Sequence, residues 1–295
     1  MRAAPSARRA ASASALRPID VRHLGREHVI CCWQVDDVLV DPGPESTVET
    51  LLEALDGEHP RALALTHIHF DHAGAAGALA RRWPDVEVWV HERGARHLAD
   101  PERLVASAKR LYGEEFDDLW GEVVPVPERS LRVLRGGERI DGWDVAYTPG
   151  HASHHVSYRH RASGWVFPGD TCGVRLPPGD LLLPPTPPPD IDLDAWRSSL
   201  DAIEAWAPER IAITHFGDFG DVGEHVERLR AALARWSDLA ARVDRETYAR
   251  ALREEIAAAV DETTAQAFAQ AMPPQDQWLG LDRWLARARE AGASG

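Results

Sequence analysis

The segment THIHFDHAG, residues 66–74, most constrains what this chain can fold into. Four side chains that commonly bind metals, His67, His69, Asp71 and His72, fall within six residues. An apolar run typical of a buried strand, RALALT, comes just before them, and a small-residue helix and a second strand, VEVWVH, follow. This β-loop-α-β order puts the segment at the C-terminal end of a strand, where α/β folds place their binding sites.

The spacing of these four side chains suits metal binding. Alternate residues of an extended loop point to one side, so His67 and His69 should face the same way. A helix beginning near Ala73 would redirect Asp71 and His72. Imidazole nitrogen suits zinc, and a carboxylate adds negative charge that stabilises a second ion. So compact a segment can therefore serve two adjacent metal ions.

Three later segments each end an apolar strand with a further candidate ligand. TPGHASHH places His151 in a turn after DVAY, FPGDTCG places Asp170 after GWVF, and AITHFGD ends with His215 in the same kind of position. Any single one of the chain's fourteen histidines would be expected to be solvated or hydrogen-bonded. The combination of these strand-end residues with the first segment instead predicts one metal centre.

These motifs closely resemble those of the metallo-β-lactamase-fold superfamily of metallohydrolases. The HxHxDH motif stands here as residues 67–72, and the later His, Asp and His follow in the family's order over roughly residues 20–220. The resemblance implies an α/β fold, a four-layer αβ/βα sandwich over residues 18–222, with a C-terminal helical extension over residues 223–295. It also implies two metal sites bridged by Asp170, with these ligands: His67, His69 and His151 for one, and Asp71, His72 and His215 for the other.

The resemblance extends to residues around the ligands. Asp41 matches an early strand-end aspartate, which implies that it orients a ligand or the loop. His155 matches a structural histidine, and for His154 a surface or hydrogen-bonding role is favoured over substrate contact. The remaining histidines are expected to be structural or solvent-exposed: His23, His28, His59, His91, His97, His160 and His225.

By the same resemblance, two Zn²⁺ per chain, with Fe or Mn as alternatives, would activate a bound hydroxide. Asp71 and Asp170 are the catalytic carboxylates of this prediction, and no Ser or Cys nucleophile is required. The preferred function is hydrolysis of a small ester, thioester or lactone, since the chain resembles the glyoxalase II-like and lactonase-like branches. The alternatives are a β-lactamase, a mononuclear iron persulfide dioxygenase and a non-catalytic metal-binding protein.

The expected partner is a small-molecule substrate, and the composition argues against nucleic acid and membrane. A net charge of −14 disfavours nucleic acid, and no apolar stretch approaches the ~20 residues that span a bilayer, so no membrane partner is expected. The adjacent Cys31 and Cys32 should not form a disulfide with each other, and three cysteines in all suit a cytoplasmic location. An apolar stripe over residues 278–285 predicts packing against the chain's own core, with a homodimer as the alternative.

The rest of the chain alternates between strands and helices. Residues 1–17 are expected to be a disordered tail, with a transit peptide as the alternative. The proline-rich residues 172–190 predict an ordered extended loop that lines the site. The other expected elements are paired strands over 21–40, helices over 46–56, 101–120, 192–206 and 222–243, strands over 131–170, and helices over 245–291 broken near Pro273-Pro274.

Overall fold

Two six-stranded sheets form the centre of the computed structural model, which describes residues 15–293. In the first sheet the first two strand pairs are antiparallel and the other three pairs are parallel. Its strands, in spatial order, are β1 (Leu16–Asp20), β2 (Cys31–Val35), β3 (Val38–Val40), β4 (Ala62–Ala64), β5 (Glu87–His91) and β6 (Leu131–Leu134). The valine-rich runs of the sequence thus become buried strands, as predicted.

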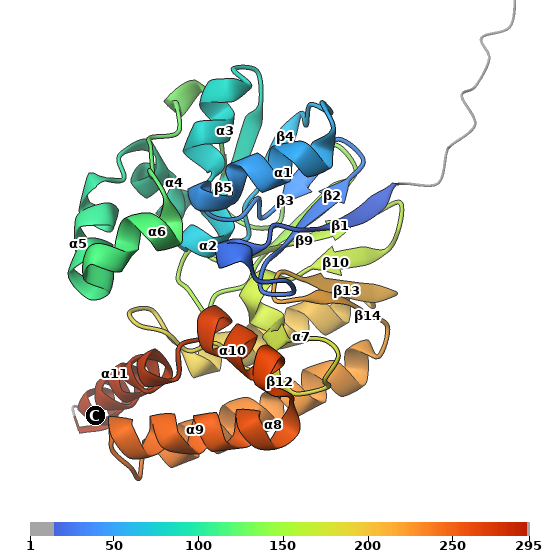
Figure 1. The fold of residues 1–295 in the computed structure, drawn as a ribbon. Helices are drawn as coiled ribbons and strands as arrows, with labels where there is room; N and C mark the ends of the chain where they lie inside the picture. The colour runs from blue at the N-terminus through green and yellow to red at the C-terminus, as the bar shows by residue number, and fades with distance from the viewer. Residues whose placement is uncertain (1–14, 294–295) are drawn as a thin grey trace, which may run out of the picture.

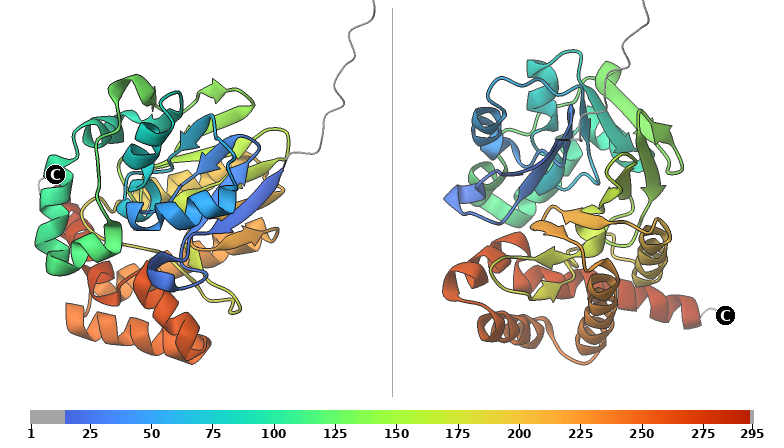
Figure 2. Two further views of the ribbon diagram at one scale, coloured as in Figure 1. Left: turned by 45° about the horizontal axis from the view of Figure 1, so that its top comes forward. Right: turned by 90° about the vertical axis from the view of Figure 1, so that its right-hand side faces the viewer.

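The second sheet is antiparallel except where β10 pairs with β13. Its strands, in spatial order, are β14 (Gly217–Phe219), β13 (Arg210–Ile213), β10 (Trp165–Phe167), β9 (Val156–His160), β8 (Trp143–Tyr147) and β7 (Arg139–Ile140). Figure 2 shows both sheets from two sides, the first coloured from blue to green and the second from yellow-green to orange. A two-stranded sheet is formed by β11 (Val174–Arg175) and β12 (Leu182–Leu183).

Helices lie outside both sheets (Figure 1). Those on the side of the first sheet are α1 (Val48–Leu55), α2 (Phe70–Ala73), α3 (Ala76–Arg82), α4 (Glu92–Ala99), α5 (Glu102–Tyr112) and α6 (Phe116–Trp120). Those on the side of the second sheet are α7 (Leu193–Ala205), α8 (Val222–Ala240), α9 (Arg245–Ala259), α10 (Glu262–Ala271) and α11 (Pro274–Ala293). The four-layer sandwich with a C-terminal helical part is therefore confirmed.

Large aromatic side chains fill the space between the two sheets. The indole Nε1 of Trp33 in β2 donates a hydrogen bond to the carbonyl oxygen of Ile213 in β13, at 3.0 Å. The rings of Trp89 in β5 and Trp143 in β8 meet edge to face, with centroids 6.2 Å apart. All three tryptophans are fully buried, and each such side chain stabilises the fold by about 1.5–3 kcal/mol. This packing fixes the strand ends of one sheet against those of the other.

One boundary predicted from the sequence is wrong. The tail expected over residues 1–17 reaches too far, because Leu16 and Arg17 already belong to β1, which pairs with β2. The mixed polar sequence LRPID gave no strand signal of its own, and the strand is stabilised by its neighbour. The rest of the expected tail, residues 1–14, lies outside the described residues.

Two expectations about buried side chains are confirmed. The three cysteines are buried and free of disulfides. Leu281 of the C-terminal apolar stripe is fully buried, and Trp278, Trp284 and Leu285 pack partly buried against the core. Among residues 15–293, none of the helices combines the length and apolarity that a bilayer span requires.

Helix α7 supports two of the strand ends that carry candidate ligands. The amide of Asp192, the N-cap of α7, donates to the carbonyl oxygen of Gly150 at 2.8 Å, and the indole of Trp196 donates to that of Thr171, also at 2.8 Å. Gly150 has a φ of +141°, and a Cβ added to it would lie 2.4 Å from the Cα of Trp196. The close approach of α7 to the turn before His151 therefore requires a glycine.

We expect Gly150→Ala to lower the free energy of unfolding by about 2–4 kcal/mol, because it adds both backbone strain and a clash with α7. Denaturant unfolding measures this change. Gly142→Ala is the matched control: its φ of +94° is also positive, but a Cβ there meets nothing within 4 Å, so about 1–2 kcal/mol is expected. Equal losses in the two variants would contradict the role given to the contact with α7.

Candidate metal centre

The seven candidate ligands come from four chain segments at the ends of strands in both sheets. His67 and His69 lie between β4 and α2, and Asp71 and His72 lie in α2. The others follow the strands of the second sheet: His151 after β8, Asp170 in the 3₁₀ turn η5 (Gly169–Cys172) after β10, and His215 after β13. The structure brings all seven side chains together, as three overlapping groups whose ligand atoms lie within 4.8 Å of one another.

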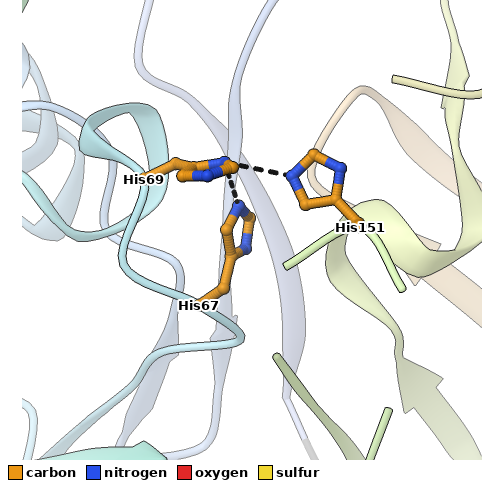
Figure 3. Close-up of side chains that lie close together, drawn as sticks. All are labelled: His67, His69 and His151. Atoms are coloured by element: carbon orange, nitrogen blue, oxygen red, sulfur yellow. Dashed lines mark hydrogen bonds between the residues drawn. The ribbon is translucent and has the colours of Figure 1, made fainter. Parts of the chain in front are cut away.

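The first group consists of His67, His69 and His151 (Figure 3). Hydrogen bonds join Nδ1 of His69 to Nε2 of His67 at 2.9 Å and to Nε2 of His151 at 3.0 Å. Figure 3 shows the three rings pointing toward a common centre from two segments of the chain. Three imidazole nitrogens in this arrangement could hold one metal ion.

The second group consists of Asp71, His72 and His215, and Asp170 lies between it and the first. Oδ2 of Asp71 lies 3.3 Å from Nε2 of His215 and 3.7 Å from Nε2 of His72. Oδ1 of Asp170 lies 3.3 Å from Nε2 of His72, and its Oδ2 lies 3.4 Å from Nε2 of His151. The Asp170 carboxylate thus touches a member of each group, which is the placement of a bridging ligand.

Three polar atoms of this cluster are buried without any hydrogen-bond partner: Nε2 of His72, Nε2 of His215 and Oδ1 of Asp170. They approach one another at ion-pair distances, but not in hydrogen-bond geometry. Unpaired buried polar atoms are costly and rare in native proteins, and those that occur often mark a bound ion. Nitrogen and carboxylate oxygen are the ligand types that zinc, iron and manganese accept, so the residues present fit a pair of divalent cations.

Electrostatics divides the histidines into two kinds. Burial, followed by repulsion from the neighbouring imidazoles, holds the pKa of His67 well below its usual value, and that of His69 falls to about 4. Burial also opposes the charging of His72 and His215, but the nearby carboxylates of Asp170 and Asp71 outweigh it and raise the pKa of each. A metal ion would replace these protons, because imidazole binds metals in its neutral form.

The opposite pattern holds for the two carboxylates. Burial alone would raise the pKa of Asp71 and of Asp170, but attraction to His72 and His215, and for Asp170 also to His151, lowers both below the usual range. Both carboxylates are therefore ionised at neutral pH, the state in which they ligate metals.

Asp41 has the contacts that its predicted orienting role requires. This buried carboxylate accepts hydrogen bonds from the amide and hydroxyl of Thr66, from the hydroxyl of Thr214 and from Nδ1 of His72, each at 2.8 Å. Since Nδ1 of His72 donates to Asp41, its Nε2 is left free to face the centre. The same carboxylate ties the end of β3 to residues that follow β4 and β13.

Backbone carbonyls orient two further rings. Nδ1 of His151 donates to the carbonyl oxygen of Pro185 at 2.9 Å, and Nδ1 of His215 donates to that of Val29 at 2.6 Å. Pro185 belongs to the proline-rich segment, so the prediction that this segment lines the site is confirmed. The sequence predictions missed Val29, Thr66 and Thr214. The two threonines could have been found, because each directly precedes a candidate ligand at a strand end, as Thr66-His67 and Thr214-His215.

The histidines outside the seven also have defined positions. The buried His155 shares hydrogen bonds with the hydroxyls of Thr148 and Thr171 at 3.0 and 3.2 Å, a structural role as predicted. His154 is half-buried, and its Nδ1 accepts a hydrogen bond from the amide of Ile68. None of the remaining seven belongs to a candidate metal group among the described residues.

The two facing sheets, with histidine and aspartate groups at their strand ends, define an α/β protein with a candidate metal centre at one edge of both sheets. Residues 36–215 match the family model of the metallo-beta-lactamase superfamily, and the chain belongs to this superfamily. The match covers the strands and turns that carry all seven candidate ligands.

A relative that matches over much of its length is a metallo-beta-lactamase fold-containing protein of Sulfurisphaera tokodaii. It is 25% identical over 209 residues, which cover 68% of this chain and 76% of the relative. The structure of this same archaeal protein, solved under the species name Sulfolobus tokodaii, superposes with a TM-score of 0.69 at 20% identity, over 90% of this chain and 98% of that one. The likeness to the solved structure supports the fold, including the C-terminal helices.

Relatives with a named activity match over shorter stretches. A hydroxyacylglutathione hydrolase of Thermosynechococcus vestitus is 32% identical over 138 residues, 45% of this chain and 42% of the relative. A probable metallo-hydrolase of Bacillus subtilis is 31% identical over 136 residues, 41% of this chain and 49% of the relative. This chain thus spans less than half the length of either protein.

We expect Asp41→Asn to weaken metal binding about 10- to 100-fold, because the amide NH₂ cannot accept from Nδ1 of His72 and the threonine hydroxyls. Competition with a chromogenic chelator measures the affinity. Asp37→Asn is the control, since Asp37 only pairs with Arg61 at the surface, and it should leave the affinity unchanged. Wild-type affinity in Asp41→Asn would show that the carboxylate does not orient the ligand.

Proposed function

We propose that this chain is a metal-dependent hydrolase that acts on a small ester, thioester or lactone. The enzyme uses two bound divalent cations, for which zinc is the preferred candidate. The observation that supports it is the convergence of seven buried or half-buried side chains that leave polar atoms unpaired. The proposed ligands are His67, His69 and His151 for one cation, Asp71, His72 and His215 for the other, and Asp170 for both.

When bound, two such cations lower the pKa of a shared water toward neutrality and polarise the group under attack. The chain's own residues hold this arrangement rigid through Asp41 and the carbonyls of Val29 and Pro185. The side chain of Asp71 is 20% exposed and that of Asp170 only 5%, and His69 is also half-buried, so substrate would approach from the side of Asp71 and His69. In our proposal the ionised Asp170, between the two groups, would relay the proton that the attacking water releases to the leaving oxygen or sulfur of the substrate.

None of the three cysteines is available as a nucleophile in place of this chemistry. Cys31, Cys32 and Cys172 are fully buried, and burial raises the pKa of each thiol far from the thiolate range. The reactive form of cysteine is the thiolate, so none of the three can attack a substrate at neutral pH. Water activated at the metal centre is the nucleophile that our proposal requires.

Turnover of a substrate panel tests the proposed function. Protein stripped with dipicolinate should be inactive, and two Zn²⁺ per chain should restore hydrolysis of at least one of 4-nitrophenyl acetate, a γ-lactone and S-lactoylglutathione, followed by absorbance or proton release. Nitrocefin turnover alone would identify a β-lactamase instead. Oxygen uptake with a persulfide at one iron per chain would identify a dioxygenase, and metal binding without any turnover would contradict an enzyme.

We expect His69→Ala and Asp170→Asn each to reduce kcat/KM by more than the roughly 10- to 100-fold typical of residues that only orient a ligand. Each variant should still show a folded far-UV circular dichroism spectrum, because neither residue belongs to the core between the sheets. His59→Ala, an exposed histidine that stacks on Trp83, is the control and should retain full activity. Unchanged turnover in either ligand variant, with metal retained, would refute the proposed mechanism.

A further inference from the structure

His154 lies beside the first group of candidate ligands without belonging to it. Its ring centroid is 5.8 Å from that of His69, with the two rings perpendicular, and 6.2 Å from that of His67, with the two rings stacked. It is half-buried, whereas His151 and His155 on the same turn are fully buried. The ring therefore borders the metal centre and also reaches solvent.

The side chain is held in place from one end of the ring. Nδ1 accepts a hydrogen bond from the amide of Ile68, the residue between His67 and His69, at 3.4 Å. Gly94 in α4 packs over this contact: a Cβ added there would lie 2.8 Å from Cγ2 of Ile68 and 3.6 Å from Cβ of His154. The absence of a side chain at Gly94 lets α4 hold the histidine against the loop.

The turn that carries His154 is anchored as well. The hydroxyl of Tyr147 donates to the carbonyl oxygen of Ser153 at 2.9 Å, and the hydroxyl of Ser153 donates to Asp190 at 2.5 Å. Tyr147 in turn stacks on His91, the N-cap of α4, with ring centroids 4.4 Å apart. Two neighbours, Tyr147 and Asp190, thus fix the residue before His154, and the hydrogen bond from Ile68 gives the ring a defined direction.

The other ring nitrogen of His154, Nε2, has no partner within the described part of the protein. Nε2 makes no hydrogen bond to any described residue, and it is not among the fully enclosed unpaired atoms, so it reaches solvent. A hydrogen bond accepted at Nδ1 uses the lone pair of that nitrogen, so the neutral ring carries its proton on Nε2. The result is a fixed N–H donor beside His69, with nothing to donate to.

We infer that His154 is a substrate-binding residue whose Nε2–H donates a hydrogen bond to the carbonyl oxygen of the bound ester, thioester or lactone. The inference rests on the proposed function, and it adds a residue outside the seven ligands. A donor fixed before substrate arrives stabilises the negative charge that develops on this oxygen as water attacks. No bond to His154 forms or breaks, and the ring stays neutral throughout.

Two variants separate this role from a purely structural one. In His154→Asn, the amide oxygen occupies roughly the place of Nδ1 and can still accept from Ile68, but nothing replaces Nε2. In His154→Gln, the amide NH₂ reaches roughly the place of Nε2, but nothing replaces the acceptor at Nδ1. If His154 is only structural, the protein needs Nδ1, and His154→Gln should be the damaging change. If His154 binds substrate, the protein needs Nε2, and His154→Asn should be the damaging change.

The experiment uses the full-length, zinc-loaded protein with three readouts: metal content, kcat and KM on the substrate with the fastest turnover, and the Kd of acetate by calorimetry. We expect His154→Asn to keep two metals per chain and to lose about 100-fold in kcat. Its affinity for acetate, whose oxygen stands in for the substrate's, should fall about three- to tenfold. His154→Gln should recover most of both losses.

Three results would overturn the inference: wild-type kcat and acetate affinity in His154→Asn, a loss in that variant that follows a loss of metal, or a defect confined to His154→Gln. These outcomes are distinct from a failure of the proposed function, in which the wild-type protein turns over nothing on the panel. In that case the acetate affinities still decide whether Nε2 of His154 binds an oxygen ligand at the centre.

Discussion

The burial of seven ligand-type side chains in one place is the constraint on which the rest of this structure depends. Five imidazoles and two carboxylates crowd the strand ends, and some of their atoms have no hydrogen-bond partner in the protein. Such an arrangement is costly unless the unpaired atoms gain a cation. The aromatic core between the sheets, the close packing of α7 and the hydrogen bonds of Asp41 all hold the cluster together against this cost.

Asp41 connects the two sheets to the candidate metal centre through its hydrogen bonds. It follows β3 in the first sheet, yet it accepts hydrogen bonds from Thr214, which follows β13 in the second, and from Thr66, which follows β4. The fourth partner, His72, belongs to the candidate ligand set. A single carboxylate therefore sets the distance between the sheets at the site and the direction of one imidazole. Membership of the metallo-beta-lactamase superfamily accounts for the fold, whereas the substrate depends on residues around this frame.

Much of this could be predicted from the sequence, because the ligands follow strands with clear apolar patterns. The HxHxDH segment and the strand-end positions of His151, Asp170 and His215 led to one cluster. Tertiary contacts left weaker signals: β1 forms on a mixed polar sequence because β2 pairs with it, and the carbonyl that orients His215 belongs to Val29, a distant residue with no side-chain signature. The position of His154 beside His69 likewise depends on the packing of α4, which alternation along a strand cannot reveal.

Anomalous X-ray diffraction from crystals grown with zinc, recorded on both sides of the zinc absorption edge, tests the central claim most directly. Two anomalous peaks per chain are expected, one among His67, His69 and His151 and one among Asp71, His72 and His215, with Asp170 between them. Peaks located elsewhere on the protein, or no ordered peak within this cluster despite saturating zinc, would contradict it.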